Sequence, residues 1–165
     1  IAQKANLFTG TIADNIRFGK EDASEAEIIH AAKVAQAYDF ISEKPNGFDE
    51  YLSEGATNLS GGQKQRLSIA RALVRKPKVY VFDDSFSALD FKTDAKLRSA
   101  LAAETKEAIT MIVAQRIATI MDADQIIVLH EGKQVGCGTH RELLASCSIY
   151  YEIAASQLSE EELKL

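Results

Sequence analysis

Apolar and polar positions follow a helical period in the first part of the chain. Residues 24–38 begin with Ser24 followed by Glu27, the pairing that forms a capping box at a helix start. The apolar positions of this stretch then recur at helical spacing, at Ile28, Ala31, Ala32, Ala35 and Tyr38. We therefore predict one amphipathic helix there, followed by a loop over 43–58 that contains Pro45, Asn46, Gly47 and Gly55.

A second helix is predicted from Gly61 to about Arg75. Ser60 is placed to act as its N-cap, Gln63 lies at the capping-box position, and Pro77 stops it. The chain up to residue 76 is thus expected to be mainly helical.

The pattern changes after residue 76 to short, continuous apolar runs. Three of these, 78–82, 108–114 and 125–130, read as strands, with helices between them at 90–104 and 117–121. Continuous apolar strands that alternate with helices predict an α/β fold whose parallel sheet is covered on both faces. A hairpin strand at 134–138 and a helix capped by Thr139 follow. We expect parts at 1–76 and 77–157, and a polar tail at 158–165 that frays.

Composition narrows the class of protein only slightly. The 165 residues are 46% hydrophobic and 26% charged, with a net charge of −5, which is ordinary for a globular chain. No basic cluster interleaved with aromatic residues is present, so nucleic acid is not an expected partner. Cys137 and Cys147 are interpreted as reduced thiols in a cytosolic setting. No apolar run approaches the roughly 20 residues that cross a bilayer, and the opening "IAQKANLF" leads us to expect a piece of a longer protein.

Two stretches carry candidate chemistry. In "LSGGQ", Leu59 to Gln63, two glycines stand just inside a capped helix start, where backbone N–H groups favour an anion such as phosphate. The alternative is that Ser60 only caps a helix and the glycines only form a turn. In "VYVFDDSFSALD", a strand ends at Asp83 and Asp84, and such a strand commonly delivers an acid to a magnesium ion.

These stretches, in this order, closely resemble the nucleotide-binding domain of ATP-binding cassette (ABC) transporters of the exporter type. Leu59–Gln63 is similar to the signature motif, Val79–Asp83 to the Walker B strand and Ser87–Asp90 to the D-loop. Gln3 in "QKANLFTGTIADNI" lies where that family has its Q-loop glutamine. The fold that the resemblance implies is a helical subdomain followed by part of a RecA-like core.

The resemblance implies that two such domains sandwich two ATP molecules and drive the attached transmembrane domains at the cytoplasmic face of a membrane. Asp83 would hold Mg²⁺, and Gln3 would sense the metal and the γ-phosphate. The signature residues would close over the partner's ATP: Leu59, Ser60, Gly61, Gly62 and Gln63. Asp90 would link the two sites across the interface. The helix over 24–38 and the loop after it would face the membrane domains.

Three features depart from the family pattern. No Gly-x-x-x-x-Gly-Lys-Ser/Thr occurs in the sequence, so the main phosphate anchor is missing and the chain alone is expected to bind ATP poorly. The residue after the Walker B acid is Asp84, where the family usually has a Glu that orients the attacking water. Gln115 stands at the position of the switch histidine, and it can donate a hydrogen bond but cannot carry a proton charge.

These changes resemble the degenerate half of a heterodimeric exporter, which would have a weak site of its own and supply its signature motif to a competent partner site. In this interpretation Asp84 is a poor catalytic base. Two alternatives stay open: that Asp84 still supports ATP hydrolysis, or that it only caps the next turn. Two other functions stay open. One is a non-catalytic regulatory module that dimerises with a competent partner. The other is a soluble ATPase of the same superfamily, which would be expected to show coiled-coil heptads or a DNA-binding surface.

Overall fold

The computed structural model describes residues 1–164, and the chain forms two compact units, Ile1–Val113 and Ala114–Leu165. Each unit has its own hydrophobic core. No helix among the described residues is long and apolar enough to cross a membrane.

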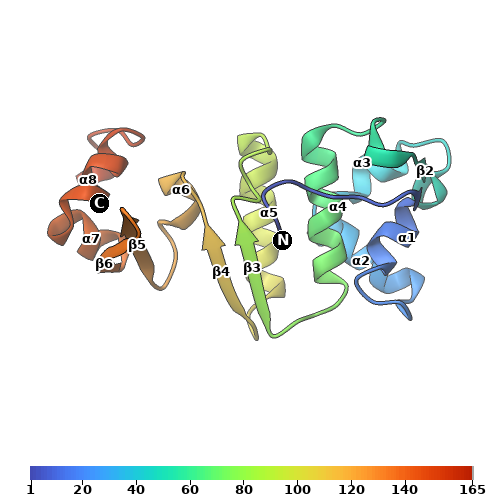
Figure 1. The fold of residues 1–165 in the computed structure, drawn as a ribbon, viewed down its shortest axis with the longest axis horizontal. Coiled ribbons are helices and arrows are strands. Elements are labelled where there is room, and N and C mark those ends of the chain that lie inside the picture. The colour runs from blue at the N-terminus through green and yellow to red at the C-terminus, as the bar shows by residue number, and fades with distance from the viewer. Residues whose placement is uncertain (165) are drawn as a thin grey trace. The chain divides into compact units, whose positions relative to one another are not determined.

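Helices make up most of the first unit (Figure 1). Their bounds are α1 Ile12–Arg17, α2 Glu25–Val34, α3 Tyr38–Ser42, α4 Gly61–Leu73 and α5 Phe91–Glu104. Helix α4 packs against α1 and α2, and α2 also packs against α5. Two short strands, β1 (Gly10–Thr11) and β2 (Tyr51–Leu52), pair antiparallel near α1. Short 3-10 turns occupy Gly47–Asp49 and Glu54–Ala56 within the predicted loop.

Strands β3 (Val79–Asp83) and β4 (Ile109–Val113) pair in parallel, which confirms the α/β class. Successive side chains of a strand point to opposite faces, and Tyr80 and Phe82 are buried in the core of the first unit. The expectation that both faces are covered is wrong for the described residues. The other face exposes a set of apolar side chains: Val79, Val81, Ile109, Met111 and Val113.

The single helix predicted over 24–38 is two helices in the structure. Helix α2 ends where Gln36 adopts a positive φ of 57°. The Gln36 N–H donates to the Lys33 carbonyl and the Ala37 N–H to the Ala32 carbonyl, which together form a Schellman motif. A residue other than glycine in the left-handed conformation gives no sequence signal for a helix end. Because the apolar spacing continues past Gln36 to Tyr38, the predicted helix ran across the break.

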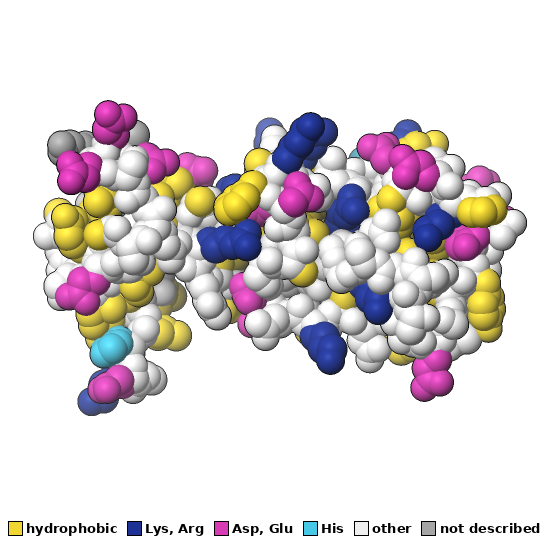
Figure 2. Space-filling model, turned by 90° about the horizontal axis from the view of Figure 1, so that it is seen from above, with side chains coloured by type: hydrophobic (Ala, Val, Ile, Leu, Met, Phe, Trp, Pro, Cys, Tyr) yellow, Lys and Arg dark blue, Asp and Glu magenta, His cyan; other side chains and the backbone are white. Residues whose placement is uncertain are grey.

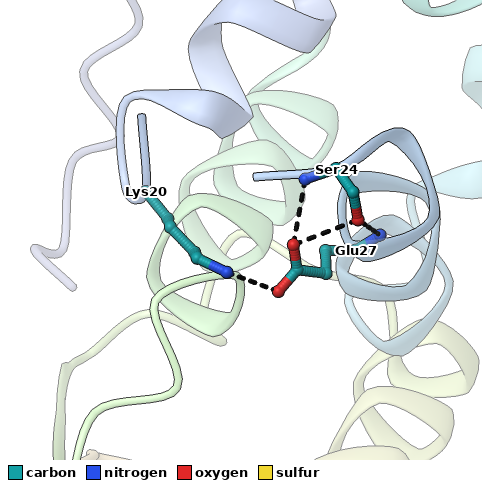
Figure 3. Close-up of polar contacts among 3 residues, drawn as sticks. All are labelled: Lys20, Ser24 and Glu27. Carbon is teal, nitrogen blue, oxygen red and sulfur yellow. Dashed lines mark hydrogen bonds and ion pairs between the residues drawn. The ribbon is translucent and has the colours of Figure 1, made fainter. Parts of the chain in front are cut away.

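The start of α2 confirms the predicted capping box and adds an ion pair to it (Figure 3). The Glu27 N–H donates to Ser24 Oγ, and the Ser24 N–H donates to Glu27 Oε2 at 2.9 Å. Lys20 Nζ lies 2.6 Å from Glu27 Oε1. The hydrogen bond from Lys20, followed by those from Ser24, lowers the pKa of Glu27 from 4.5 to about 2.

Glu27→Gln is expected to reduce the pH dependence of stability at acid pH. Because the pKa of Glu27 is lower in the folded chain, its stabilising effect is present above pH 4.5 and is lost as the pH falls towards 2. Urea unfolding at several pH values should show the largest gap between wild type and Glu27→Gln near neutral pH, closing below pH 4.5. A gap that stays constant down to pH 2 would contradict this assignment.

The second unit is built on a hairpin of β5 (Ile126–His130) and β6 (Lys133–Gly138). Glu131 and Gly132 both have positive φ, as a two-residue type I′ turn requires. The hairpin was predicted, but β5 was also expected to continue the parallel sheet. Instead it pairs antiparallel with β6, and β3 and β4 form a separate sheet.

Helices α6 (Ile117–Ile120), α7 (His140–Ser146) and α8 (Ser148–Ala155) complete this unit. Thr139 caps α7, as predicted, whereas α8 was not predicted. The expectation of a frayed tail is wrong for the part that the structure describes. Ser159 and Glu162 form a capped turn before a short 3-10 helix, Glu162–Lys164, and Leu158 and Leu163 pack against the core of this unit. Leu165 lies outside the described residues.

Candidate functional site

The acidic end of β3 is held in place by backbone hydrogen bonds. The Asp84 N–H donates to the Val113 carbonyl at 2.8 Å, and Ser87 Oγ donates to the Asp84 carbonyl at 2.9 Å. Asp84 has a positive φ of 45°, a conformation in which Asp and Asn are several-fold enriched among residues other than glycine. The backbone at this position therefore favours Asp or Asn over a longer acid.

Gln3 lies against this acidic end although it is 81 positions away in the sequence. Its Nε2 donates to Asp84 Oδ2 at 2.9 Å. The segment before it is tied to the same strand, because the Ile1 carbonyl accepts the Asp83 N–H and Ser85 Oγ, each at 2.9 Å. The structure thus brings together Gln3, Asp83 and Asp84, three residues singled out from the sequence. The side chain of Asp84 accepts the hydrogen bond from Gln3, whereas in the following turn Ser87 bonds to the backbone carbonyl of Asp84.

The chemistry of this cluster fits a magnesium nucleotide better than a metal held by protein alone. Mg²⁺ is usually bound by one or two carboxylates together with substrate phosphates. Asp83 and Asp84 supply that number of carboxylates at one strand end. Within residues 1–164, no group of three or more His, Cys, Asp or Glu side chains is arranged to hold a metal.

The start of α4 shows the predicted capping box. Ser60 Oγ accepts the Gln63 N–H at 3.2 Å, and the Ser60 N–H donates to Gln63 Oε1 at 2.9 Å, while Leu59 is buried beside them. The two glycines differ in their surroundings. A Cβ on Gly62 would lie 3.1 Å from the Ala88 carbonyl oxygen, whereas one on Gly61 would meet nothing within 4 Å. The chain itself therefore requires a small residue at 62 but leaves open space at 61.

Asp90 has a structural part as well as a predicted functional one. Its Oδ1 accepts the Thr93 N–H at 2.9 Å, so it is the N-cap of α5, and this hydrogen bond lowers the pKa of the carboxyl group. Because Gly62 approaches Ala88, the stretch 87–90 lies against the first turn of α4.

Gln115 lies in the second unit, in the segment between β4 and α6. Gln157, which the sequence did not single out, holds this segment at both ends. Its Nε2 donates to the Gln115 carbonyl and its Oε1 accepts the Ile117 N–H, each at 2.9 Å. No motif or apolar period marks Gln157, because its hydrogen bonds go to backbone atoms about forty positions earlier. The predicted contact of Gln115 with a γ-phosphate stays a prediction.

The two arginines of α4 pack inside the chain rather than facing open solvent. Arg71 donates to Asn6 and Asn15 and lies over the ring of Phe8 at 4.8 Å. Arg66 donates to the Gln36 and Gly62 carbonyls and lies over the ring of Phe40. Burial lowers the pKa of both guanidinium groups.

An aromatic pair lies on the surface beside Arg71. The rings of Phe8 and Phe18 are 4.6 Å apart, and Phe18 is 70% exposed. Over the described residues on the face that Figure 2 shows, Lys and Arg side chains are interspersed with Asp and Glu. An exposed aromatic pair is therefore a more distinctive surface feature here than charge is.

The sequence of residues 1–87, more than half of the chain, matches the ABC transporter family. The ABC transporter ATP-binding protein YfiB of Bacillus subtilis (strain 168) is 50% identical over 161 residues, which are 98% of this chain and 28% of that protein. Human ATP-binding cassette sub-family B member 5 is 43% identical over 157 residues, covering 95% of this chain and 12% of that protein.

A bacterial Atm1-family ABC exporter, solved with ATP bound, matches in three dimensions. Its TM-score is 0.91 at 41% identity, over 96% of this chain and 28% of that one. The chain belongs to the ABC transporter family, and its fold is that of an exporter's ATP-binding domain. The chain spans little more than a quarter of the length of the Bacillus relative.

Proposed function

We propose that this chain is the signature-motif part of the ATPase domain of an exporter, which couples ATP binding and hydrolysis to transport. The observation that carries the proposal is the hydrogen bond from Gln3 to Asp84, beside Asp83 at the end of β3. An amide beside two carboxylates supports the binding and sensing of a magnesium nucleotide at this strand end. The activity is ATP hydrolysis by positioning and charge stabilisation around a transferring phosphoryl group.

In this proposal each residue has a separate role. Asp83 holds the magnesium ion, directly or through water, and Gln3 senses the metal and the γ-phosphate. When bound, Mg²⁺ neutralises charge on the phosphate oxygens. Gln115 donates a hydrogen bond towards the γ-phosphate. Asp90 links the two sites across the interface.

The start of α4 serves the nucleotide of a second ATPase domain. At the start of α4 the Gly61 and Gly62 N–H groups have no acceptor within the helix, and such groups favour an anion. The open space beside Gly61 supports this role, because a Cβ there would meet nothing within 4 Å among the described residues.

We further propose that the chain is the weaker half of a heterodimeric pair. The Asp84 carboxylate is one methylene shorter than a glutamate, and Gln115 cannot carry a proton charge. The backbone at Asp84 supports this proposal, because its positive φ is better tolerated by Asp than by Glu. The functional division at residues 76 and 77 is kept as part of this proposal.

A non-catalytic regulatory half is the second candidate. It is favoured by the Gln3–Asp84 hydrogen bond itself, because an acid occupied by an amide is less available to orient water. The catalytic and regulatory proposals differ in whether replacing Asp84 by the family's glutamate raises ATP turnover.

The membrane domains are the other proposed partner, at the cytoplasmic face of a membrane. The family resemblance implies this contact for residues 24–38 and the loop after them. The rings of Phe8 and Phe18 are exposed, and the Arg71 guanidinium lies over both of them. They add an exposed apolar contact surface to the same unit, of the kind that contributes strongly to protein interfaces.

Calorimetric titration with Mg-ATP tests the proposal. We expect no binding heat for the isolated chain, because a P-loop is not among its residues, and micromolar binding for the full transporter that carries it. A non-hydrolysable ATP analogue in both titrations separates binding from turnover. Micromolar binding to the isolated chain would contradict the missing phosphate anchor, and no binding to the full transporter would overturn the proposed function.

A further inference from the structure

Gln65 is a buried polar residue on the apolar stripe of α4. It stands four positions before Ile69 and eight before Leu73, both of which are buried, and it is itself 1% exposed. Its Nε2 donates to the Ala2 carbonyl at 3.1 Å, across 63 positions of sequence. A polar residue at a core position of a helix is a sequence signal for a specific buried hydrogen bond.

The carbonyl that Gln65 holds belongs to the residue immediately before Gln3. Gln3 in turn donates to Asp84, and the preceding Ile1 carbonyl is tied to Asp83 and Ser85. The segment is thus attached to the end of β3 on one side and to α4 on the other. In Figure 1 it runs from beside β3 across α4 towards α1.

The attachment to α4 matters because of where that helix begins. Gln65 lies four residues after Gly61, which is about 6 Å along a helix. Over so short a distance a helix moves as one rigid piece. A displacement of the helix start is therefore passed to Ala2, and through it to Gln3.

We propose that Gln65 is a positioning residue for Gln3, tying it to the helix that carries the signature motif. This inference rests on the proposed function, in which Gln3 senses the metal. Gln65 does not touch the nucleotide; it fixes the backbone from which Gln3 reaches the acidic end of β3. The competing explanation is that the Gln65 amide only makes a hydrogen bond to the Ala2 carbonyl that stabilises the fold.

The test is a double-mutant cycle on the magnesium requirement of ATP turnover, in the full transporter with its partner domain. Gln65→Met keeps the size and helix propensity of the side chain but removes the donor. We expect Gln3→Ala and Gln65→Met each to raise the Mg²⁺ concentration for half-maximal turnover about tenfold. ATP affinity in EDTA should stay unchanged for Gln65→Met, because Gln65 does not touch the nucleotide. The double variant should match Gln3→Ala alone, because residues that act through one contact are not additive.

Ser85→Ala is the matched control. It also removes one hydrogen bond to the segment, at the Ile1 carbonyl, but that carbonyl keeps its bond from the Asp83 N–H and α4 is untouched. Its magnesium requirement should change less than about twofold, while all variants are assayed well below their melting midpoints. Gln65→Leu replaces Gln65→Met if the latter does not fold.

The outcomes separate this inference from the proposed function. If Gln3→Ala shifts the magnesium requirement but Gln65→Met does not, or if the two shifts multiply, the positioning role is overturned and the proposed function stands. If Gln3→Ala has no effect, the role of Gln3 in the proposed function fails and the inference falls with it.

Discussion

Restoring the family residues at both altered positions, with Asp84→Glu and Gln115→His together, is expected to raise ATP turnover at this domain's own site by up to about a hundredfold. The reason is the length of the side chain at residue 84, because displacing a catalytic carboxylate by about 1 Å can lower the rate about a hundredfold. The glutamate gains one methylene, and the histidine adds a group that can carry a proton charge. Two local features work against the gain, namely the positive φ of residue 84 and the hydrogen bond from Gln3.

The measurement needs the partner's own hydrolysis to be silent. Turnover is therefore compared in the assembled transporter after the partner's catalytic carboxylate is replaced by an amide. Asp84→Asn is the matched control, since it keeps the side-chain size and the tolerance of a positive φ but removes the charge. It should give no increase. If the double variant also gives no increase, Asp84 and Gln115 do not limit turnover at this site, and the result favours a non-catalytic regulatory role.

Gly61→Leu is expected to lower turnover of the assembled pair by about a hundredfold while leaving the fold intact. A Cβ at 61 would meet nothing within 4 Å among the described residues, so a loss of turnover with the fold intact is expected to come from what approaches the open side of residue 61. In the proposed function that is the partner's nucleotide, which a leucine would displace by more than 1 Å. Leucine is also a better helix former than glycine, so the melting midpoint should stay the same or rise.

Gly62→Ala is the contrasting variant, because its Cβ would lie 3.1 Å from the Ala88 carbonyl oxygen. It should lower the melting midpoint of the isolated chain, which Gly61→Leu should not. Thermal unfolding of both variants, alongside turnover in the pair, distinguishes a steric requirement inside the chain from one at the interface. Normal turnover in Gly61→Leu would contradict a role for the signature motif in the partner's site.

Much of this protein could be predicted from the sequence because the relevant interactions are local. The capping boxes at Ser24 and Ser60 and the N-cap at Thr139 join residues three apart, and each forms as predicted. The strand at 79–83 and the hairpin of β5 and β6 follow from apolar runs and turn residues. The motifs around Ser60 and Asp83 pointed to the family to which the chain belongs.

Tertiary structure decided what depends on contacts between distant segments. The break at Gln36 carries no local signal, and neither does the finding that β5 does not pair with the β3–β4 sheet, because a left-handed residue and the order of strands in a sheet are decided by packing. The same holds for Gln65 and Gln157, which bond to backbone carbonyls far along the chain. The sequence by itself determined which carboxylates, amides and glycines are available to the proposed nucleotide site. Only the folded chain brought Gln3 within hydrogen-bonding distance of Asp84, because hydrogen bonds from Asp83, Ser85 and Gln65 fix the segment before Gln3 between β3 and α4.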